Sequence, residues 1–301
     1  MRDVFFIVGP TATGKSELAA DVARDLEAEI VSADAFQIYN GLDLLTAKPG
    51  SATLAKAPHH LIGTIPIEEE MNAEKFRRIA LRVIGEIQAR GKRANVVGGS
   101  GLYIKALTHG LSSVPAPDPT VRARLNRMSL DQLQARLADL DPETARKIDI
   151  KNRRRLVRAL ELCLMADRSA SYQRNWGKVS VGLAGVFVFR ERDELYQRIN
   201  RRVEAMFENG VIEEIRASAA MSATASQMIG LREVRELLEG KMSILQCVTA
   251  IQQATRRYAK RQLTWFRRQP NFEPLNLSLL THQEAVKWIS RRVLSFAPGD
   301  D

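Results

Sequence analysis

The sequence predicts an α/β fold in which a parallel β-sheet is flanked by helices and an all-helical lobe is inserted into the chain. Short apolar runs rich in β-branched and aromatic residues recur, and helical patterns separate most of them, which is typical of a parallel α/β sheet. The lobe is predicted because the strand pattern stops after residue 111 and a proline-rich segment leads into helical sequence.

The predicted strands lie on both sides of the lobe. They are Val4–Val8, Ile30–Ser32, His60–Ile65, Ala94–Val97 and Leu183–Phe189. Between residues 72 and 90, apolar side chains recur every three or four positions, so this segment is predicted as a crossover helix that Gly91 ends. Other helices are predicted near residues 15–24, 196–207, 228–238 and 243–268.

The lobe is predicted to interrupt the core, so residues 1–113 and 183–301 form one domain and residues 114–182 the other. Its entry carries Pro115, Pro117 and Pro119, which predict a stiff linker. Its helices are unusually rich in cations: Arg122, Arg124, Arg127, Lys147, Lys151, Arg153, Arg154, Arg155 and Arg158. From the sequence alone, these cations could form a polyanion-binding surface or an ordinary solvated charged face.

Composition favours a polyanionic partner. The 301 residues include 45 Lys and Arg against 35 Asp and Glu, giving a net charge of +10 and a pI near 9.8. Cys163 and Cys247 lie far apart and form no C-x-x-C pair, which argues against a disulfide framework or a zinc ribbon and fits a reducing cytoplasm. No apolar stretch approaches the roughly 20 residues of a membrane helix, so a cytoplasmic protein without a membrane partner is expected.

The most specific motif follows the first predicted strand. Gly9-Pro10-Thr11-Ala12-Thr13-Gly14-Lys15-Ser16 fills every specified position of the phosphate-binding G-x-x-x-x-G-K-[ST] pattern, so the sheet is expected to be like that of P-loop NTPases. Backbone amides, Lys15 and the start of the next helix would hold phosphate oxygens, and Ser16 would ligate Mg²⁺. A glycine-rich turn without a ligand is the alternative, and the motif leaves the phosphate compound open.

Asp34 follows the second predicted strand, at the sheet edge where open α/β sheets bind ligands. From position alone it could be a magnesium ligand, a general base or a helix cap. Farther along, residues 256–268 interleave cations with aromatic side chains, as in nucleic-acid grooves. For Trp265 a place in the core is an equally good interpretation. His59 and His60 would point to opposite faces of a strand and could not chelate a metal together without other ligands.

Several ordered segments resemble the tRNA dimethylallyltransferase (isopentenyltransferase) family. They are residues 9–16, Asp34–Tyr39, Thr46–Pro49, Val97–Tyr103, Arg155–Glu161, Ile229–Glu233 and Thr255–Trp265. The similarity extends over nearly the whole chain, and the tail after residue 271 lacks cysteine, so it resembles the compact bacterial form. The resemblance implies transfer of a dimethylallyl group from dimethylallyl diphosphate to N6 of the adenosine 3′-adjacent to the anticodon. The phosphate loop would then hold the donor diphosphate with Mg²⁺.

The resemblance also implies roles for individual residues. Asp34 would be the base that takes the N6 proton, Lys15 would bind the diphosphate, and Ser100 would contact the adenine or the donor phosphate, with a turn-capping hydroxyl as its alternative. Arg198 and Arg202 share one helical face, and at least one would reach the diphosphate. The implied tRNA-binding residues are Asp34, Ala35, Phe36, Gln37, Ser100, Arg122, Arg154, Arg155, Arg158, Gln227, Gly230 and Arg232. Since one RNA stem needs no second subunit, a monomer is expected.

The chain departs from the family pattern at three places. Asp34-Ala35 replaces the usual Asp-Ser, Leu44-Leu45 the usual Ile-Gly, and Lys151-Asn152 the usual Asn-Asp. Three other functions stay open: a cytokinin-type transferase that prenylates free adenine nucleotides, a small-molecule P-loop kinase, and an RNA-binding module with a vestigial loop. The basic lobe argues against a transferase for free nucleotides. The 255–265 segment argues against a kinase, and the intact phosphate loop argues against a module that only binds RNA.

Overall fold

The computed structural model describes residues 4–111, 118–166 and 184–296, and its centre is a six-stranded sheet in the order β3-β2-β4-β1-β5-β6. The strands are β1 (Val4–Val8), β2 (Glu29–Ser32), β3 (His59–His60), β4 (Ala94–Gly98), β5 (Ala184–Phe189) and β6 (Glu273–Asn276). Each neighbouring pair is parallel. The predicted α/β class with a parallel, P-loop-like sheet is confirmed.

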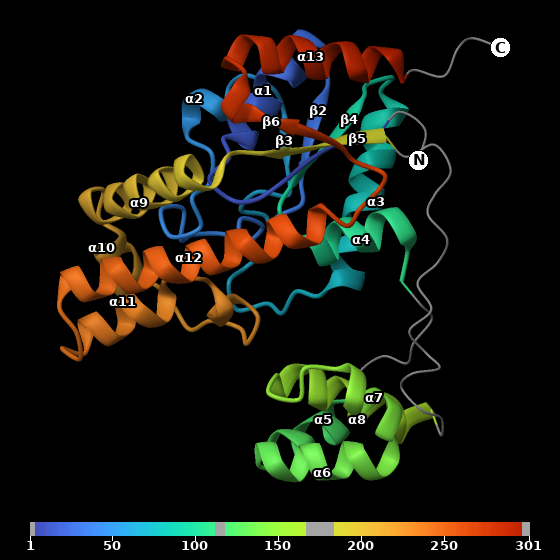
Figure 1. The fold of residues 1–301 in the computed structure, drawn as a ribbon, viewed down its shortest axis with the longest axis vertical. Coiled ribbons are helices and arrows are strands. Elements are labelled where there is room, and N and C mark those ends of the chain that lie inside the picture. Colours follow the sequence, from blue (N-terminus) through green and yellow to red (C-terminus); the bar gives the residue numbers. More distant parts are fainter. Residues whose placement is uncertain (1–3, 112–117, 167–183, 297–301) are drawn as a thin grey trace. The chain divides into compact units, whose positions relative to one another are not determined.

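Helices cover both faces of this sheet (Figure 1). Those of the core are α1 (Lys15–Asp25), α2 (Ser51–Leu54), α3 (Ala73–Ala89), α4 (Gly101–His109), α9 (Arg192–Glu208), α10 (Val211–Arg216), α11 (Leu231–Leu238), α12 (Ile244–Phe266) and α13 (His282–Ser295). Phe5 and Ile7 of β1 pack toward α1 and α13, whereas Phe6 and Val8 pack in the cluster that includes α3, α4 and α12. Alternation along one buried strand therefore supplies two hydrophobic layers.

The segment from 60 to 65 corrects one sequence prediction. Only His59 and His60 pair with β2, because Leu61 at φ +63° and Gly63 at φ +61° turn the chain out of the extended conformation. Pairing resumes only as a single bridge between Tyr39 and Ile65. A strand is present here as predicted, but it ends at His60, and its predicted extension to Ile65 was wrong. The short edge strand β6 and the helices α4 and α13 were not predicted.

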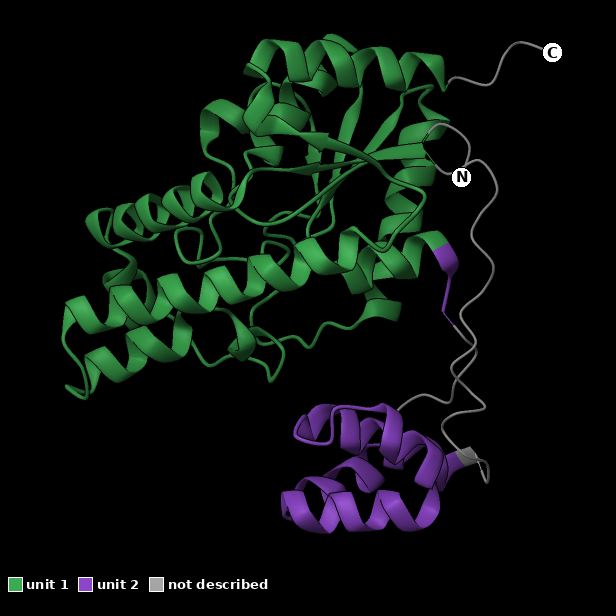
Figure 2. Cartoon of the chain, viewed as in Figure 1, with its two compact units in different colours: residues 1–108, 179–301 green, residues 109–178 purple. Residues whose placement is uncertain are grey.

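The chain divides into two compact units, residues 1–108 with 179–301 and residues 109–178 (Figure 2). The smaller unit contains α5 (Pro119–Asn126), α6 (Leu130–Leu140), α7 (Pro142–Lys147) and α8 (Arg153–Ala166). Its own core is built around Leu125, Leu133, Leu137, Leu156 and Leu160. The predicted boundaries at 113/114 and 182/183 fall outside the described residues. Over the described parts of both units, none of the helices has the length and apolar character needed to span a membrane.

Candidate active site

The phosphate-loop motif forms the turn between β1 and α1. Two glycines are required there for different reasons. A Cβ at Gly9 would lie 2.1 Å from the carbonyl oxygen of Val188, so the loop passes too close to β5 for a side chain. Gly14 caps α1 at φ +91°, a left-handed conformation that favours glycine. The loop therefore brings its backbone to the positive end of α1, where anions bind.

Two arginines hold this loop through its carbonyl oxygens. Arg198 donates from Nε to the carbonyl oxygen of Ala12 at 2.8 Å, and Arg190 donates from Nε to the carbonyl oxygen of Thr13 at 2.8 Å. Both carbonyl oxygens are thus held by guanidinium groups, which leaves the amide side of the loop for an anion. The sequence indicated Arg198 but missed Arg190, whose signal is its position directly after β5.

Lys15 and Arg202 bring two poorly solvated cations together at the loop. Burial lowers the pKa of Lys15 to about 8, while the charge of Asp34 raises it and that of Arg202 lowers it. Burial likewise lowers the pKa of Arg202 to about 10, again opposed by Asp34. Within the described residues, the buried Nε of Arg202 has no hydrogen-bond partner. Two such cations favour an anionic ligand between them.

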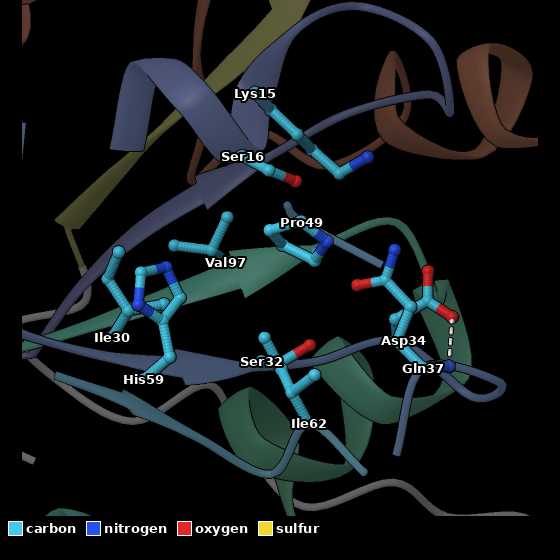
Figure 3. A pocket seen from close by; sticks show the side chains of 11 residues that line it. Lys15, Ser16, Ile30, Ser32, Asp34, Gln37, Pro49, His59, Ile62 and Val97 are labelled. Atoms are coloured by element: carbon cyan, nitrogen blue, oxygen red, sulfur yellow. Dashed lines mark hydrogen bonds between the residues drawn. The ribbon is translucent and has the colours of Figure 1, made fainter. Parts of the chain in front are cut away.

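Asp34 uses only one of its two carboxylate oxygens to hold local structure. Its Oδ1 accepts hydrogen bonds from the backbone amides of Phe36 at 2.9 Å and Gln37 at 3.2 Å, and the bond to Gln37 is drawn in Figure 3. Oδ2 accepts none from the described part of the chain. The capping interpretation is therefore right for Oδ1, while Oδ2 stays available to a ligand.

Ser100 ties the Asp34 turn to the loop between β4 and α4. Its hydroxyl oxygen accepts the backbone N–H of Ala35 at 2.9 Å, and its own N–H donates to the carbonyl oxygen of Ala33 at 3.3 Å. The hydroxyl thus has the turn-holding contact expected of its alternative role. Because a hydroxyl oxygen can accept one bond and still donate its proton, Ser100 can also serve a ligand.

Tyr258 on α12 also belongs to this site, and the sequence did not single it out. Burial and the nearby charge of Asp34 raise the pKa of its phenol, while hydrogen bonds with Ser100 and Gln262 act in the opposite direction. Tyr258 thus stays a neutral donor beside the carboxylate. Its only signal in the sequence is its place in the 255–265 segment.

One pocket joins the phosphate loop to the Asp34 turn (Figure 3). It is lined by Lys15, Ser16, Ile30, Ser32, Asp34, Gln37, Pro49, His59, Ile62, Val97 and Gly98. Lys15 and Ser16 lie at the loop and Asp34 and Gln37 at the turn, whereas Ser32 and His59 lie among the apolar walls formed by Ile30, Ile62 and Val97. Such a lining suits a ligand with an anionic end and a small apolar end.

The pocket also provides hard oxygen donors of the kind that Mg²⁺ prefers. Ser16, Ser32 and Asp34 line it together. No group of three or more His, Cys, Asp or Glu side chains that could hold a metal occurs among the described residues. A Mg²⁺ ion shared with a diphosphate fits this set, because it keeps several waters and needs few protein ligands. His59 and His60 have separate partners, the carbonyl oxygen of Ala57 and the carboxylate of Glu29.

Gln37 is held in one orientation by the loop that carries the Leu44-Leu45 departure. Its Nε2 donates to the carbonyl oxygens of Thr46 at 3.2 Å and Ala47 at 2.8 Å. Because both partners are acceptors, the amide nitrogen must point toward them and Oε1 is left for a ligand. The loop itself is fixed by Glu214 on α10, whose carboxylate accepts the backbone N–H groups of both leucines at 2.8 and 2.9 Å.

The remaining predicted tRNA-binding residues fall into two groups. In the core, Gln227 is exposed, Gly230 begins α11 at φ +96°, and Arg232 is exposed and paired with Glu233 at 2.8 Å. In the helical unit, two of the predicted arginines are paired with a buried carboxylate and two are exposed.

Arg122 and Arg158 both pair with the fully buried Glu161, at 2.5 and 3.2 Å. They therefore support the helical unit itself. Arg154 and Arg155 on the same helix, α8, are exposed and make no ion pair with a described residue.

Comparison with known proteins gives consistent matches. The IPP transferase family model matches residues 37–269. A tRNA dimethylallyltransferase of Citrifermentans bemidjiense is 43% identical over 270 residues, covering 87% of this chain and 88% of that protein. One of Akkermansia muciniphila is 43% identical over 265 residues, covering 88% and 90%. The solved structure of the full-length tRNA isopentenylpyrophosphate transferase from Bacillus halodurans superposes with a TM-score of 0.73 at 31% identity, covering 99% of this chain and 97% of that one.

Proposed function

The chain belongs to the IPP transferase family of tRNA dimethylallyltransferases, and on that premise we propose that it transfers a dimethylallyl group from dimethylallyl diphosphate to adenine N6 of the tRNA nucleoside that follows the anticodon. The product is N6-isopentenyladenosine and inorganic diphosphate. The enzyme works as a cytoplasmic monomer with Mg²⁺.

One observation carries the proposal. Two poorly solvated cations and a carboxylate oxygen without a partner among the described residues lie together at the carboxyl edge of the sheet. Lys15 and Arg202 are desolvated cations at the phosphate loop, and both feel the charge of Asp34. A diphosphate held by the cations thus places its ester carbon within the same site as the base.

The reaction requires activation of the nucleophile, N6, and stabilisation of the leaving group, the diphosphate. The lone pair of adenine N6 is delocalised into the ring, so N6 becomes nucleophilic only as its proton is removed. Asp34 Oδ2 accepts that proton while the N6–carbon bond forms and the bond from carbon to the diphosphate oxygen breaks. The electron pair of the broken bond passes to the diphosphate, whose charge Lys15, Arg202 and the loop amides stabilise.

Mg²⁺ bound through Ser16 would neutralise further charge on the diphosphate. Ser100 and Tyr258 lie beside Asp34 and are neutral donors for the adenine or for the donor phosphate. Gln37 contributes an oriented acceptor at the same pocket. These side chains orient the reactants and do not exchange protons with them.

The exposed basic side chains bind the tRNA in this proposal. Arg154 and Arg155 are exposed cations on the helical unit, and Gln227, Gly230 and Arg232 belong to the core. In this proposal the two arginines contact phosphates, which position the RNA without reading its sequence. Ala35, Phe36 and Gln37 shape the pocket for an adenine turned out of the anticodon loop. Arg122 and Arg158 act on the tRNA through the structure of the helical unit.

A direct test uses purified protein, Mg²⁺, dimethylallyl diphosphate and unmodified total tRNA, followed by digestion of the RNA and mass spectrometry of its nucleosides. Prenylated adenosine in the tRNA supports the proposal. Product formed on free AMP instead would favour a nucleotide prenyltransferase, and phosphate release from ATP would favour a kinase. Absence of all three products would rule out the prenyl-transfer function.

A further inference from the structure

Gln262 joins the two halves of the candidate site through one side chain. It lies on α12 and is only 6% exposed. Its Oε1 accepts the backbone N–H of Thr11 in the phosphate loop at 2.9 Å, and its Nε2 donates to the carbonyl oxygen of Gly99 at 2.8 Å. Gly99 directly precedes Ser100. A single amide therefore connects the loop for the donor with the loop that faces the acceptor.

The bridge leaves no freedom in how the amide is oriented. An N–H partner requires the side-chain oxygen and a carbonyl partner requires the side-chain nitrogen, so only one orientation satisfies both. Space is equally restricted, because a Cβ at Gly99 would lie 2.4 Å from Nε2 and 2.9 Å from the carbonyl oxygen of Gly9. Gly9 in turn donates to the carbonyl oxygen of Gly98 at 3.2 Å. The two loops are in direct contact around this side chain.

The bridge is separate from the groups that bind the anion. Arg190 and Arg198 brace the second half of the phosphate loop, at Thr13 and Ala12, whereas Gln262 holds only its first half, at Thr11. Loss of Gln262 thus leaves the braced carbonyls, Lys15 and the start of α1 in place. What it removes is the fixed distance from that loop to the loop that carries Ser100, together with the hydrogen bond to Tyr258.

We propose that Gln262 is a positioning residue that sets the alignment between the prenyl donor and the acceptor adenine, and so governs the chemical step more than diphosphate binding. This inference rests on the proposed function, because the acceptor side of the site is assigned there. A displacement of about 1 Å between reacting groups can cost about 100-fold in rate. Removal of the bridge is therefore expected to act on kcat.

The first test variant is Gln262→Leu, which keeps roughly the size of the side chain and removes its hydrogen bonds to Thr11, Gly99 and Tyr258. We expect kcat to fall by roughly 100-fold and the Kd for inorganic diphosphate, measured by calorimetry, to change by less than about threefold. Gln252→Ala is the matched control, because Gln252 lies on the same helix and, within residues 4–111, 118–166 and 184–296, its side chain hydrogen-bonds only Glu204, at 3.1 Å. The control is expected to keep the activity of the unaltered enzyme.

A second variant, Gln262→Glu, separates positioning from a general loss of structure. Its carboxylate can still accept the Thr11 N–H but, when ionised, cannot donate to Gly99, whereas the protonated acid can do both. Burial raises the pKa of such an acid. The ratio of its activity to that of the unaltered enzyme should therefore rise as the pH falls from about 8 to about 6.

Each outcome decides the proposal. Full kcat in Gln262→Leu would overturn it, as would an activity ratio for Gln262→Glu that does not change with pH. An equal loss of diphosphate affinity and kcat would assign Gln262 to anion binding instead and would also overturn it. If the unaltered enzyme forms no prenylated tRNA, the proposed function fails first, and the diphosphate titration still reports whether the loop binds its anion without the bridge.

Discussion

Arg198 donates its Nε hydrogen to the carbonyl oxygen of Ala12 at 2.8 Å, so one donor of this arginine is used by the phosphate loop itself. Arg202 lies one turn later on α9, and its buried Nε has no partner among the described residues. The sequence placed both arginines on one face without separating their roles. The structure shows Arg198 Nε bonded to the loop, and we predict that Arg202 is the arginine that binds the diphosphate.

Arg202→Ala is therefore expected to weaken diphosphate binding more than Arg198→Ala does. A charge-assisted hydrogen bond to a buried anion contributes about 1.5–3 kcal/mol, so the Kd for inorganic diphosphate should rise roughly 10- to 100-fold in the Arg202 variant. Calorimetric titration measures it. Equal effects of the two substitutions would contradict the separate roles.

Asp34→Asn is expected to lower kcat by about 100- to 10,000-fold, the usual contribution of a general base, while the fold is retained. Asn keeps a side-chain oxygen that can accept the amides of Phe36 and Gln37, as Asp34 Oδ1 does. Asp34→Ala removes both the base and the cap, so it should also lower the melting temperature. Single-turnover rates and thermal melts distinguish the two effects. An Asn variant with normal turnover would exclude Asp34 as the base.

The donor specificity constant should fall as the pH rises through about 8. The pKa of Lys15 is lowered to about 8 in the free site, so its positive charge is present below that pH and lost above it. Because kcat/KM reports groups of the free enzyme, the loss should approach tenfold per pH unit on the alkaline side. Lys15→Arg keeps its charge at higher pH and should lack this alkaline limb. The same limb in both proteins would assign it to another group.

Arg155→Ala and Arg122→Ala should separate tRNA contact from support of the helical unit. Arg155 is exposed, so its loss should weaken tRNA binding, lower the salt slope by about one and leave stability unchanged. Arg122 donates from Nε and Nη2 to the buried Glu161, which keeps Arg158 as a second partner, so removal of Arg122 should cost about 1.5 kcal/mol in that unit. Hydrogen exchange in α8 and tRNA titrations at several salt concentrations measure both. Unchanged exchange in the Arg122 variant would be inconsistent with a structural role.

Glu214→Ala should disturb Gln37 from a distance. The carboxylate of Glu214 fixes Leu44 and Leu45, and the following carbonyls of Thr46 and Ala47 hold the Gln37 amide. We expect a higher KM for tRNA with little change in diphosphate affinity, because these hydrogen bonds of the relay do not involve the phosphate loop. Glu213→Ala is a suitable control, since Glu213 is an exposed neighbour on α10. Identical kinetics of the two variants would argue against the relay.

The sequence alone determined the class of sheet, the phosphate loop, the place of Asp34 and the family. These follow from local order in the chain, since a glycine at a left-handed turn, a lysine beside it and alternating strand and helix patterns are readable within a few residues. The same local reasoning failed for residues 60–65, where Leu61 and Gly63 turn a β-like sequence out of the sheet.

Only the tertiary structure decided which distant side chains complete the site. Gln262 reaches Thr11 across 251 positions, and Arg190 reaches Thr13 across 177. It also separated the paired Arg122 from the exposed Arg155, although both stand in the same basic pattern. Hydrogen bonding and desolvation depend on which groups the fold packs together, and no local pattern in the sequence records those neighbours.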